Sequence, residues 1–224
     1  MQRAMLATPA YDGRLDVAYT YSLLETIKLC AAHGVALHPV WWPGEALIQH
    51  ARNMLVQIAV ESKVDAVLFA DSDQSWQPAD ALKLLAYPVH VVGAPVRKKS
   101  DDESWNVRSL TPHFPVDEQT GLWKANAIGT GFLRVSGEAL QTVWARSKPY
   151  SKGGQQCRMV FDVPVIDGEL WGEDTIFCSK LAECGYPIYV DPKMQVGHHG
   201  SKNYTGDFEA YVNSLQKASL RVVG

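Results

Sequence analysis

Two carboxylates follow an apolar run in AVLFADSDQSW, residues 66–76. Asp71 and Asp73 stand on either side of Ser72, directly after residues that we expect to form a buried strand. Both carboxylates can then reach one point, where their ionised forms repel each other unless a cation lies between them. Oxygen ligands from a short acidic segment suit Mg²⁺ or Mn²⁺, which keep positions open for phosphate oxygens. The segment therefore indicates a divalent metal site, with a plain surface turn as the alternative.

A second acidic pair opens WGEDTIFCSKLAECG, residues 171–185, which we expect to be a helix. Glu173 and Asp174 fall in its first turn, where the helix dipole and the free amides stabilise ionised carboxylates. A carboxylate held in this way is suited to act as a general base. Glutamate and aspartate are also common at helix starts without any catalytic role. The preceding Trp171 could stack on a sugar or pack in the core.

Two adjacent histidines lie in GHHG, residues 197–200, at the end of a short predicted strand. Alternation along the strand places Val196 and His198 on one side, so His198 is the favoured metal ligand. An imidazole nitrogen is a good ligand for Mn²⁺. His199 would point elsewhere, or take the role itself if the strand has already ended.

The elements that must position these residues alternate between strands and helices in the first half of the chain. The expected strands are residues 4–9, 35–42, 65–71 and 89–96, and the expected helices are residues 17–33, 45–62 and 78–86. This order predicts an open α/β sheet with right-handed crossovers. In such a sheet the ligand site lies beyond the carboxyl ends of the strands.

The second half of the chain is less regular. A polar segment at residues 97–127, with a hairpin around residues 117–123, is expected to be mobile. The other expected elements are strands at 127–136, 159–165, 187–192 and 194–200, helices at 137–147, 171–185 and 207–222, and a loop at 148–156. There is no internal repeat and no long linker, so we expect one domain over residues 1–224.

The composition excludes several classes of protein. The 224 residues are 46% hydrophobic and carry a formal net charge of −3, so nothing in the total demands nucleic acid or an anionic membrane as partner. The four cysteines lack any CxxC spacing, which favours reduced thiols and a cytoplasmic location. No run of 18 apolar residues occurs, so no transmembrane segment or signal peptide is expected.

Residues 45–85 resemble the nucleotide-sugar segment of glycosyltransferases with the GT-A fold, especially family 2, in which a helix bearing ARN precedes a strand that ends in DxD. WGED and the later histidine resemble the acceptor-side signature of the same family. The resemblance covers roughly residues 1–95 and 128–200. It implies one α/β domain of the Rossmann-like GT-A fold, with a mixed central sheet flanked by helices. Its parts would be a nucleotide-sugar half at 1–95, an acceptor and metal half at 96–200, and a C-terminal helix at 201–224.

The resemblance also implies roles for individual residues. Asp73 would ligate the metal, Asp71 would bind the donor ribose or a metal-bound water, and Asp174 would be the base, with Glu173 placing the acceptor or replacing Asp174. The implied donor contacts are Thr8, Pro9, Arg52, Asn53, Asp71, Ser72 and Asp73. The implied acceptor contacts are Gly129, Gly131, Trp171 and Gly172, and the implied metal ligands are Asp73, His198 and Asp71. A surface ion pair for Arg52 and a β-bulge for the two glycines are the alternatives.

The expected protein is a metal-dependent glycosyltransferase that uses Mn²⁺ or Mg²⁺ and moves a sugar from a nucleoside-diphosphate sugar to a hydroxyl acceptor, with inversion. The acceptor would be a saccharide, a lipid-linked saccharide or a modified DNA base. In the last case the basic segments 97–110 and 148–158 would hold phosphates. A catalytically silent nucleotide-sugar binding module is the other alternative. The sequence HPVWW, residues 38–42, replaces the family's acidic residue that reads the nucleobase, so the base is not predicted.

Overall fold

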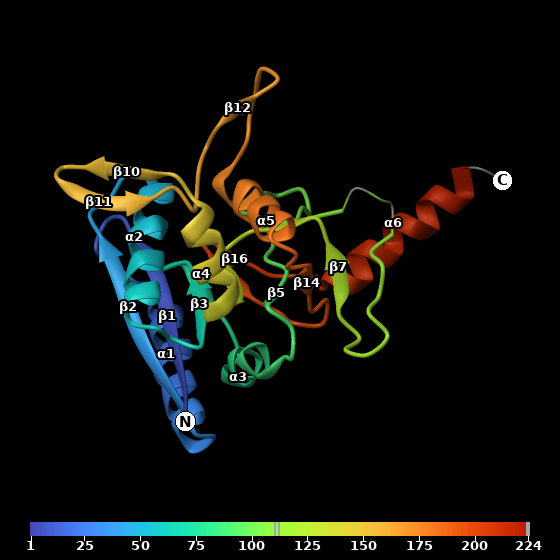
Figure 1. Ribbon diagram of the computed structural model, residues 1–224. Coiled ribbons are helices and arrows are strands. Elements are labelled where there is room, and N and C mark those ends of the chain that lie inside the picture. Colours follow the sequence, from blue (N-terminus) through green and yellow to red (C-terminus); the bar gives the residue numbers. More distant parts are fainter. Residues whose placement is uncertain (110, 112, 223–224) are drawn as a thin grey trace.

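A seven-stranded mixed sheet forms the centre of the protein (Figure 1). The computed structural model describes residues 1–109, 111 and 113–222, with side chains as far as residue 216. In spatial order the strands are β2 (Val35–Pro43), β1 (Gln2–Ala10), β3 (Ala66–Ala70), β9 (Phe132–Ser136), β5 (Val91–Gly93), β14 (Ile188–Val190) and β7 (Trp123–Ala125). Strands β9 and β7 run antiparallel to their neighbours, and the other pairings are parallel.

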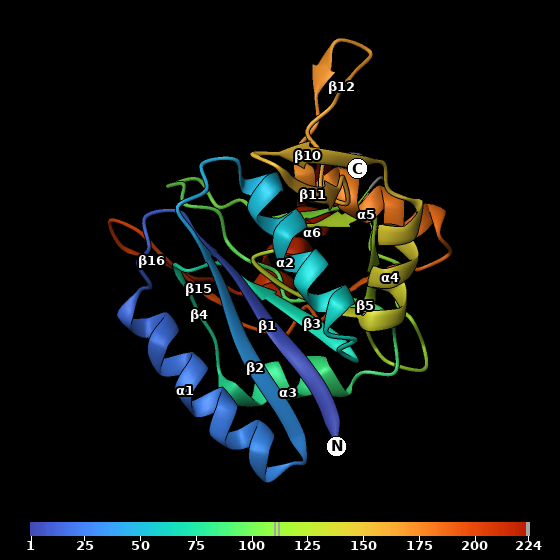
Figure 2. The ribbon, with the colours of Figure 1, turned by 60° about the vertical axis from the view of Figure 1, so that its left-hand side comes forward.

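Helices cover both faces of this sheet (Figures 1 and 2). The helices are α1 (Val17–Ala32), α2 (Ile48–Glu61), α3 (Pro78–Ala86), α4 (Gly137–Arg146), α5 (Glu173–Glu183) and α6 (Phe208–Val222). Along β1, Ala4 and Leu6 pack with α1 and α3, whereas Met5 and Ala7 pack with α2, α4 and α5. Burial on both faces explains why these strands read as continuous apolar runs. The expected α/β fold class, with a mixed central sheet flanked by helices, is confirmed.

The expected elements of the first half are confirmed with small shifts at their ends. Helix α2 begins at Ile48 rather than at residue 45, because Leu47 has an extended backbone and its amide is bonded to the Glu45 carboxylate at 2.9 Å. The strand expected at 127–136 is interrupted at its glycines and divides into β8 (Ala127–Ile128) and β9. These two pieces pair with different strands, β8 with β6 (Val107–Arg108) and β9 with β3 and β5.

The strand expected over residues 159–165 is wrong. The backbone of Phe161 is bonded instead to the Asn53 side chain, with Phe161 N donating to Oδ1 at 2.7 Å and Nδ2 donating to Phe161 O at 3.0 Å. The Lys180 ammonium donates to Met159 O at 2.6 Å and to Val160 O at 3.1 Å. Side chains from two helices therefore supply the partners that a neighbouring strand would otherwise supply.

Asn53 should accordingly be important for stability. Asn53→Ala leaves the N–H and C=O groups of Phe161 without partners in a buried position, where each unmet group costs about 1–3 kcal/mol. We expect a loss of about 2–4 kcal/mol in the free energy of unfolding, measured by urea denaturation. Gln57→Ala, on the same helix, removes one exposed bond to Glu61 and should change stability by less than about 0.5 kcal/mol. Equal losses in the two variants would contradict the anchoring role of Asn53.

Two β-hairpins project from the helical layer, and the first of them replaces the loop expected at residues 148–156 (Figure 1). The first joins β10 (Pro149–Lys152) to β11 (Gln155–Arg158), and the second joins β12 (Val165–Ile166) to β13 (Glu169–Leu170). Each turn has two residues with positive φ, Gly153 and Gly154 in the first and Asp167 and Gly168 in the second. Positive φ at both central residues is typical of type I′ hairpin turns, in which glycine and Asp-Gly are favoured.

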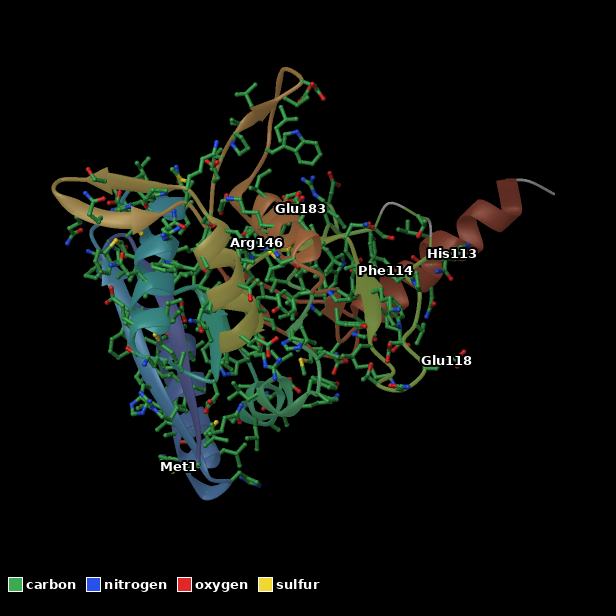
Figure 3. The ribbon with its side chains drawn as sticks, in the orientation of Figure 1. Met1, His113, Phe114, Glu118, Arg146 and Glu183 are labelled. Atoms are coloured by element: carbon green, nitrogen blue, oxygen red, sulfur yellow. The ribbon has the colours of Figure 1, made fainter. Side chains whose placement is uncertain are left out.

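An aromatic cluster ties the polar segment after β5 to α6. Phe114 stacks on Trp123 with ring centroids 5.5 Å apart, and both rings contact Phe208 at the start of α6. Figure 3 shows Phe114 beside β7 and α6. An isolated bridge between Val116 and Trp123 places the expected hairpin here.

Within the described residues, no helix is both long enough and apolar enough to cross a membrane.

Asp191, which follows β14, provides a test of stability against pH. Although burial acts to raise the pKa of Asp191, hydrogen bonds from Lys83 and Tyr87, both at 2.7 Å, lower it below its ordinary value. A carboxyl with a lowered folded-state pKa stabilises the fold above its unfolded pKa of about 3.9 and loses this effect as pH falls through the folded value. We expect Asp191→Asn to be less stable than the wild type at pH 7 and the difference to shrink towards pH 3, as measured by urea denaturation. A difference that does not change with pH would contradict this assignment.

Candidate functional site

A small cavity of about 170 Å³ lies beyond the carboxyl ends of β3 and β5. Asp71 and Asp174 line it, together with His198 from the far end of the chain. Gly129 and Gly131 form another part of the wall. The structure therefore brings residues from four separate segments to the edge of the sheet where a ligand is expected.

A three-stranded sheet positions His198 near the acidic segment. Its strands are β16 (Asn203–Tyr204), β15 (Gly197–His199) and β4 (Gln74–Ser75). The register pairs His198 with Gln74, and the amide of His199 donates to Asp73 O at 2.7 Å. The short strand β4 thus continues directly from the acidic segment and holds the histidines beside it.

Asp73 and His198 face each other with atoms left unsatisfied. His198 Nδ1 lies 2.9 Å from Arg97 O, and because a carbonyl only accepts, Nδ1 carries the hydrogen. His198 Nε2 lies 3.6 Å from Asp73 Oδ1, a buried oxygen without a hydrogen-bond partner among the described residues. Mg²⁺ binds ligands at about 2.1 Å, so two ligand atoms of one ion lie no more than about 4.2 Å apart. The pair fits a divalent cation, with His198 rather than His199 as the imidazole ligand.

Asp71 does not join this pair. Arg52 Nη2 donates to Asp71 Oδ1 at 3.0 Å, which directs the carboxylate towards α2. Burial raises the pKa of Asp71 above its ordinary value, and the nearby Asp174 and Asp73 add to this effect, whereas Arg52 opposes it. Over residues 1–109, 111 and 113–222, no group of three or more His, Cys, Asp or Glu side chains is arranged to hold a metal ion. The expectation of three protein ligands therefore needs correction, because Arg52 engages the third.

Arg52 is a buried arginine at the centre of three partly exposed carboxylates. Its Nη1 donates to Glu173 Oε1 at 2.6 Å and to Asp174 Oδ1 at 3.0 Å, while Nη2 binds Asp71. The Arg52 side chain is only 5% exposed. The attraction of the three carboxylates outweighs burial and raises the pKa of the guanidinium. Arg52, an expected donor contact, holds three acidic side chains together through its charge.

Asp174 is oriented by two donors and keeps one oxygen available. Thr130 Oγ1 donates to Asp174 Oδ1 at 2.5 Å, alongside the bond from Arg52. Asp174 Oδ2 accepts no hydrogen bond from the residues that the structure describes, and the side chain is 34% exposed. The cavity-lining residues Gln74, Val96 and Asn106 were not predicted from the sequence, and neither was Thr130. The only signal for Thr130 was its place between Gly129 and Gly131.

Three of the expected donor contacts, Thr8, Pro9 and Asn53, have buried side chains. Two of these side chains already have hydrogen-bond partners, and proline has no polar side-chain atom. Thr8 Oγ1 bonds to the Tyr19 hydroxyl at 2.6 Å, and Pro9 is buried in β1. Asn53 is fully buried and binds the backbone of Phe161. The strand and the helix that carry these residues turn their side chains into the core. Ser72 is partly exposed at the turn after β3.

The expected acceptor residues fall into two groups. Gly129 and Gly131 are buried at the cavity, where an added Cβ at Gly129 would lie 2.6 Å from Asn106 Nδ2 and one at Gly131 would collide with the Gln74 amide. Close packing of these amides is therefore a sufficient reason for both glycines. Trp171 is 38% exposed and Gly172 has open space around it, at the point where the β12–β13 hairpin leads into α5. The structure places them next to Glu173 but outside the cavity lining.

Comparisons with known proteins identify the fold. No protein-family model matches the chain, and no curated protein matches its sequence. The crystal structure of A197 from STIV is similar to the chain with a TM-score of 0.55 at 15% identity, covering 89% of this chain and 86% of that one. The chain shares the fold of A197. At this identity the likeness shows the fold alone.

Glycosyltransferases are also among the solved structures that match the chain. One is involved in the glycosylation of the major capsid of PBCV-1, with 15% identity, a TM-score of 0.36, and coverage of 65% of this chain and 66% of that one. Another is GalNAc-T7 with UDP, GalNAc and Mn²⁺, with 12% identity and a TM-score of 0.47. This match covers 88% of the present chain but only 44% of GalNAc-T7. Both TM-scores lie below 0.5.

Proposed function

We propose that this protein is a metal-dependent glycosyltransferase that moves a sugar from a nucleoside-diphosphate sugar to a hydroxyl group, with inversion. The observation that carries this proposal is the pair formed by Asp73 Oδ1 and His198 Nε2, 3.6 Å apart and beside the cavity that Asp174 lines. Asp73 Oδ1 has no hydrogen-bond partner among the described residues and so is free to bind a cation, and the Asp174 carboxylate at the cavity can accept a proton. A cation site next to a general base can support transfer from a diphosphate, because the cation stabilises the leaving group and the base activates the acceptor.

The proposed reaction is a single displacement. The acceptor oxygen forms a bond to the anomeric carbon, and the bond from that carbon to the diphosphate oxygen breaks, with the electron pair leaving on the nucleoside diphosphate. Asp174 Oδ2 takes the proton of the acceptor hydroxyl, while Arg52 and Thr130 hold Oδ1. Asp73 and His198 would hold Mn²⁺ or Mg²⁺, which neutralises charge on the departing diphosphate. Glu173, bound to the same Arg52, is the alternative base.

We further propose that residues 1–224 act as one catalytic domain, with a hydroxyl-bearing saccharide or lipid-linked saccharide as acceptor. Several of the basic side chains considered for binding DNA phosphates already have partners. Arg97 donates to Thr205 O, Lys152 pairs with Glu45, and Arg158 bonds to the carbonyl groups at the end of α4. These contacts favour a non-nucleic acceptor.

The test is a thermal-shift screen of nucleoside-diphosphate sugars with and without Mn²⁺. A ligand that binds only the folded state stabilises it and so raises the melting temperature. The gain is about 2.7 kcal/mol in the free energy of unfolding when the ligand concentration is a hundred times its Kd. We expect a rise that requires both the donor and the metal, and slow release of nucleoside diphosphate in the same samples. No metal-dependent rise with any sugar nucleotide would remove the proposal, and binding without release or transfer would leave a binding module.

Asp73 and His198 can be tested separately from the donor. We expect Asp73→Ala and His198→Ala each to weaken Mn²⁺ binding by at least about 10- to 100-fold, as measured from the free Mn²⁺ signal by electron paramagnetic resonance. His199→Ala is the matched control, because His199 Nε2 bonds to Ser75 Oγ at 2.8 Å rather than facing Asp73. Loss of binding only in the His199 variant would reverse the assignment of the two histidines.

A further inference from the structure

A lysine already neutralises the carboxylate that we assign to the metal. Lys99 Nζ lies 2.5 Å from Asp73 Oδ2, while Oδ1 of the same carboxylate faces His198. Positive charge therefore approaches Asp73 from one side, and the unpartnered oxygen lies on the other. A divalent cation bound to Asp73 would lie close to this ammonium, and the two like charges would repel each other.

Hydrogen bonds to the preceding residues hold the backbone that leads into Lys99. The segment that carries it is held by the bond from His198 Nδ1 to Arg97 O and by the bond from Lys98 N to Ser104 O. The aliphatic part of Lys99 passes over Gly200, where an added Cβ would lie 3.1 Å from Lys99 Cδ. Gly200 thus leaves room for the lysine to reach Asp73, beside the strand that carries His198.

The segment also lies at the mouth of the cavity. Arg97 and Lys98, which precede Lys99, both line the cavity that Asp71 and Asp174 share. The Lys99 side chain is 34% exposed, so its ammonium can leave Asp73 by rotation of the side chain without unfolding the segment. Once released, this ammonium remains close to the position of the cation and can bind phosphate oxygens.

We propose that Lys99 is the internal counter-ion of Asp73, that a divalent cation displaces it, and that the displaced ammonium then binds the diphosphate of the donor. This inference rests on the metal site of the proposed function. It gives Lys99 two opposite effects, because the same charge opposes the metal and favours the phosphates. A residue with a purely structural role would not produce effects of opposite sign.

The test is to measure metal and nucleotide binding for Lys99→Gln. In a titration with MnCl₂ alone, followed by electron paramagnetic resonance, Lys99→Gln should bind Mn²⁺ about tenfold more tightly than the wild type. In saturating Mn²⁺, the same variant should bind nucleoside diphosphates, tested as UDP, GDP, CDP and dTDP, about tenfold more weakly. Lys99→Arg keeps the charge and should follow the wild type in the metal titration.

Lys202→Gln is the matched control. Lys202 is a neighbouring surface lysine that pairs with Asp101 at 2.6 Å, so its removal takes away the same charge without touching Asp73. Equal Mn²⁺ affinity in the wild type and Lys99→Gln would overturn the inference, and so would an equal gain in Lys202→Gln. A third outcome is that Lys99→Gln binds Mn²⁺ more tightly but the protein binds no nucleoside diphosphate. This would support Lys99 as the counter-ion of Asp73 and contradict the proposed function.

Discussion

Asp174→Asn should abolish most of the transfer activity while leaving the donor bound. The asparagine keeps an oxygen for Thr130 and fills the same volume, but it cannot accept the proton of the acceptor hydroxyl. A positioned general base contributes about 10²- to 10⁴-fold to a rate, so we expect the rate of sugar transfer to fall by this factor. The measurement is transfer from a labelled donor, with the metal-dependent thermal shift of the donor as the readout of binding.

The matched variant is Glu173→Gln. Glu173 shares the Arg52 bond with Asp174 but lies outside the cavity lining, so its loss should reduce transfer far less. A larger loss in Glu173→Gln than in Asp174→Asn would exchange the two roles. Full transfer by Asp174→Asn would show that this carboxylate does not act as the base. The proposed single displacement, in which Asp174 accepts the proton, would then be wrong.

The sheet could be predicted because its signals are local. Strands β1 and β3 are apolar runs that end at polar or turn-forming residues, and α3 starts at Pro78, a residue favoured in the first turn. The segment at 159–165 carries the same apolar signal but forms no strand. Its backbone partners, Asn53 and Lys180, lie far away in the sequence, and no local pattern reveals them.

The residues of the site could be predicted from their types and spacing, but the contacts that they make with one another could be predicted only in part. Alternation along β15 selects His198 over His199, and the structure turns His198 to Asp73. Arg52 was identified from its place on α2, but the sequence does not show that three carboxylates from two other segments converge on it. This convergence depends on how the fold places α2, the start of α5 and the turn after β3 relative to one another. The direction of the Arg52 side chain could therefore not be predicted from its own segment.

Arg52→Ala should be the most destabilising single substitution considered. Removing one member of a buried ion pair typically costs about 3–5 kcal/mol, because the remaining charge is left uncompensated. Here three carboxylates, Asp71, Glu173 and Asp174, lose one shared partner. We expect a loss of about 3–5 kcal/mol in the free energy of unfolding at pH 7, measured by urea denaturation. Arg52→Lys should recover only part of this loss, because one ammonium cannot reproduce the planar fork that reaches all three groups.

Charge repulsion among the three carboxylates can be separated from loss of packing. Arg52 lowers the pKa of Asp71, so without Arg52 the folded-state pKa rises further above the unfolded value. A group with such a raised pKa destabilises the fold when it is ionised, and this penalty disappears as pH falls through the folded value. The loss in Arg52→Ala should therefore shrink between pH 7 and pH 4, and adding Asp71→Asn should restore part of the stability at pH 7. A loss that is independent of pH and is not reduced by the second substitution would mean that Arg52 acts through packing and not through its charge.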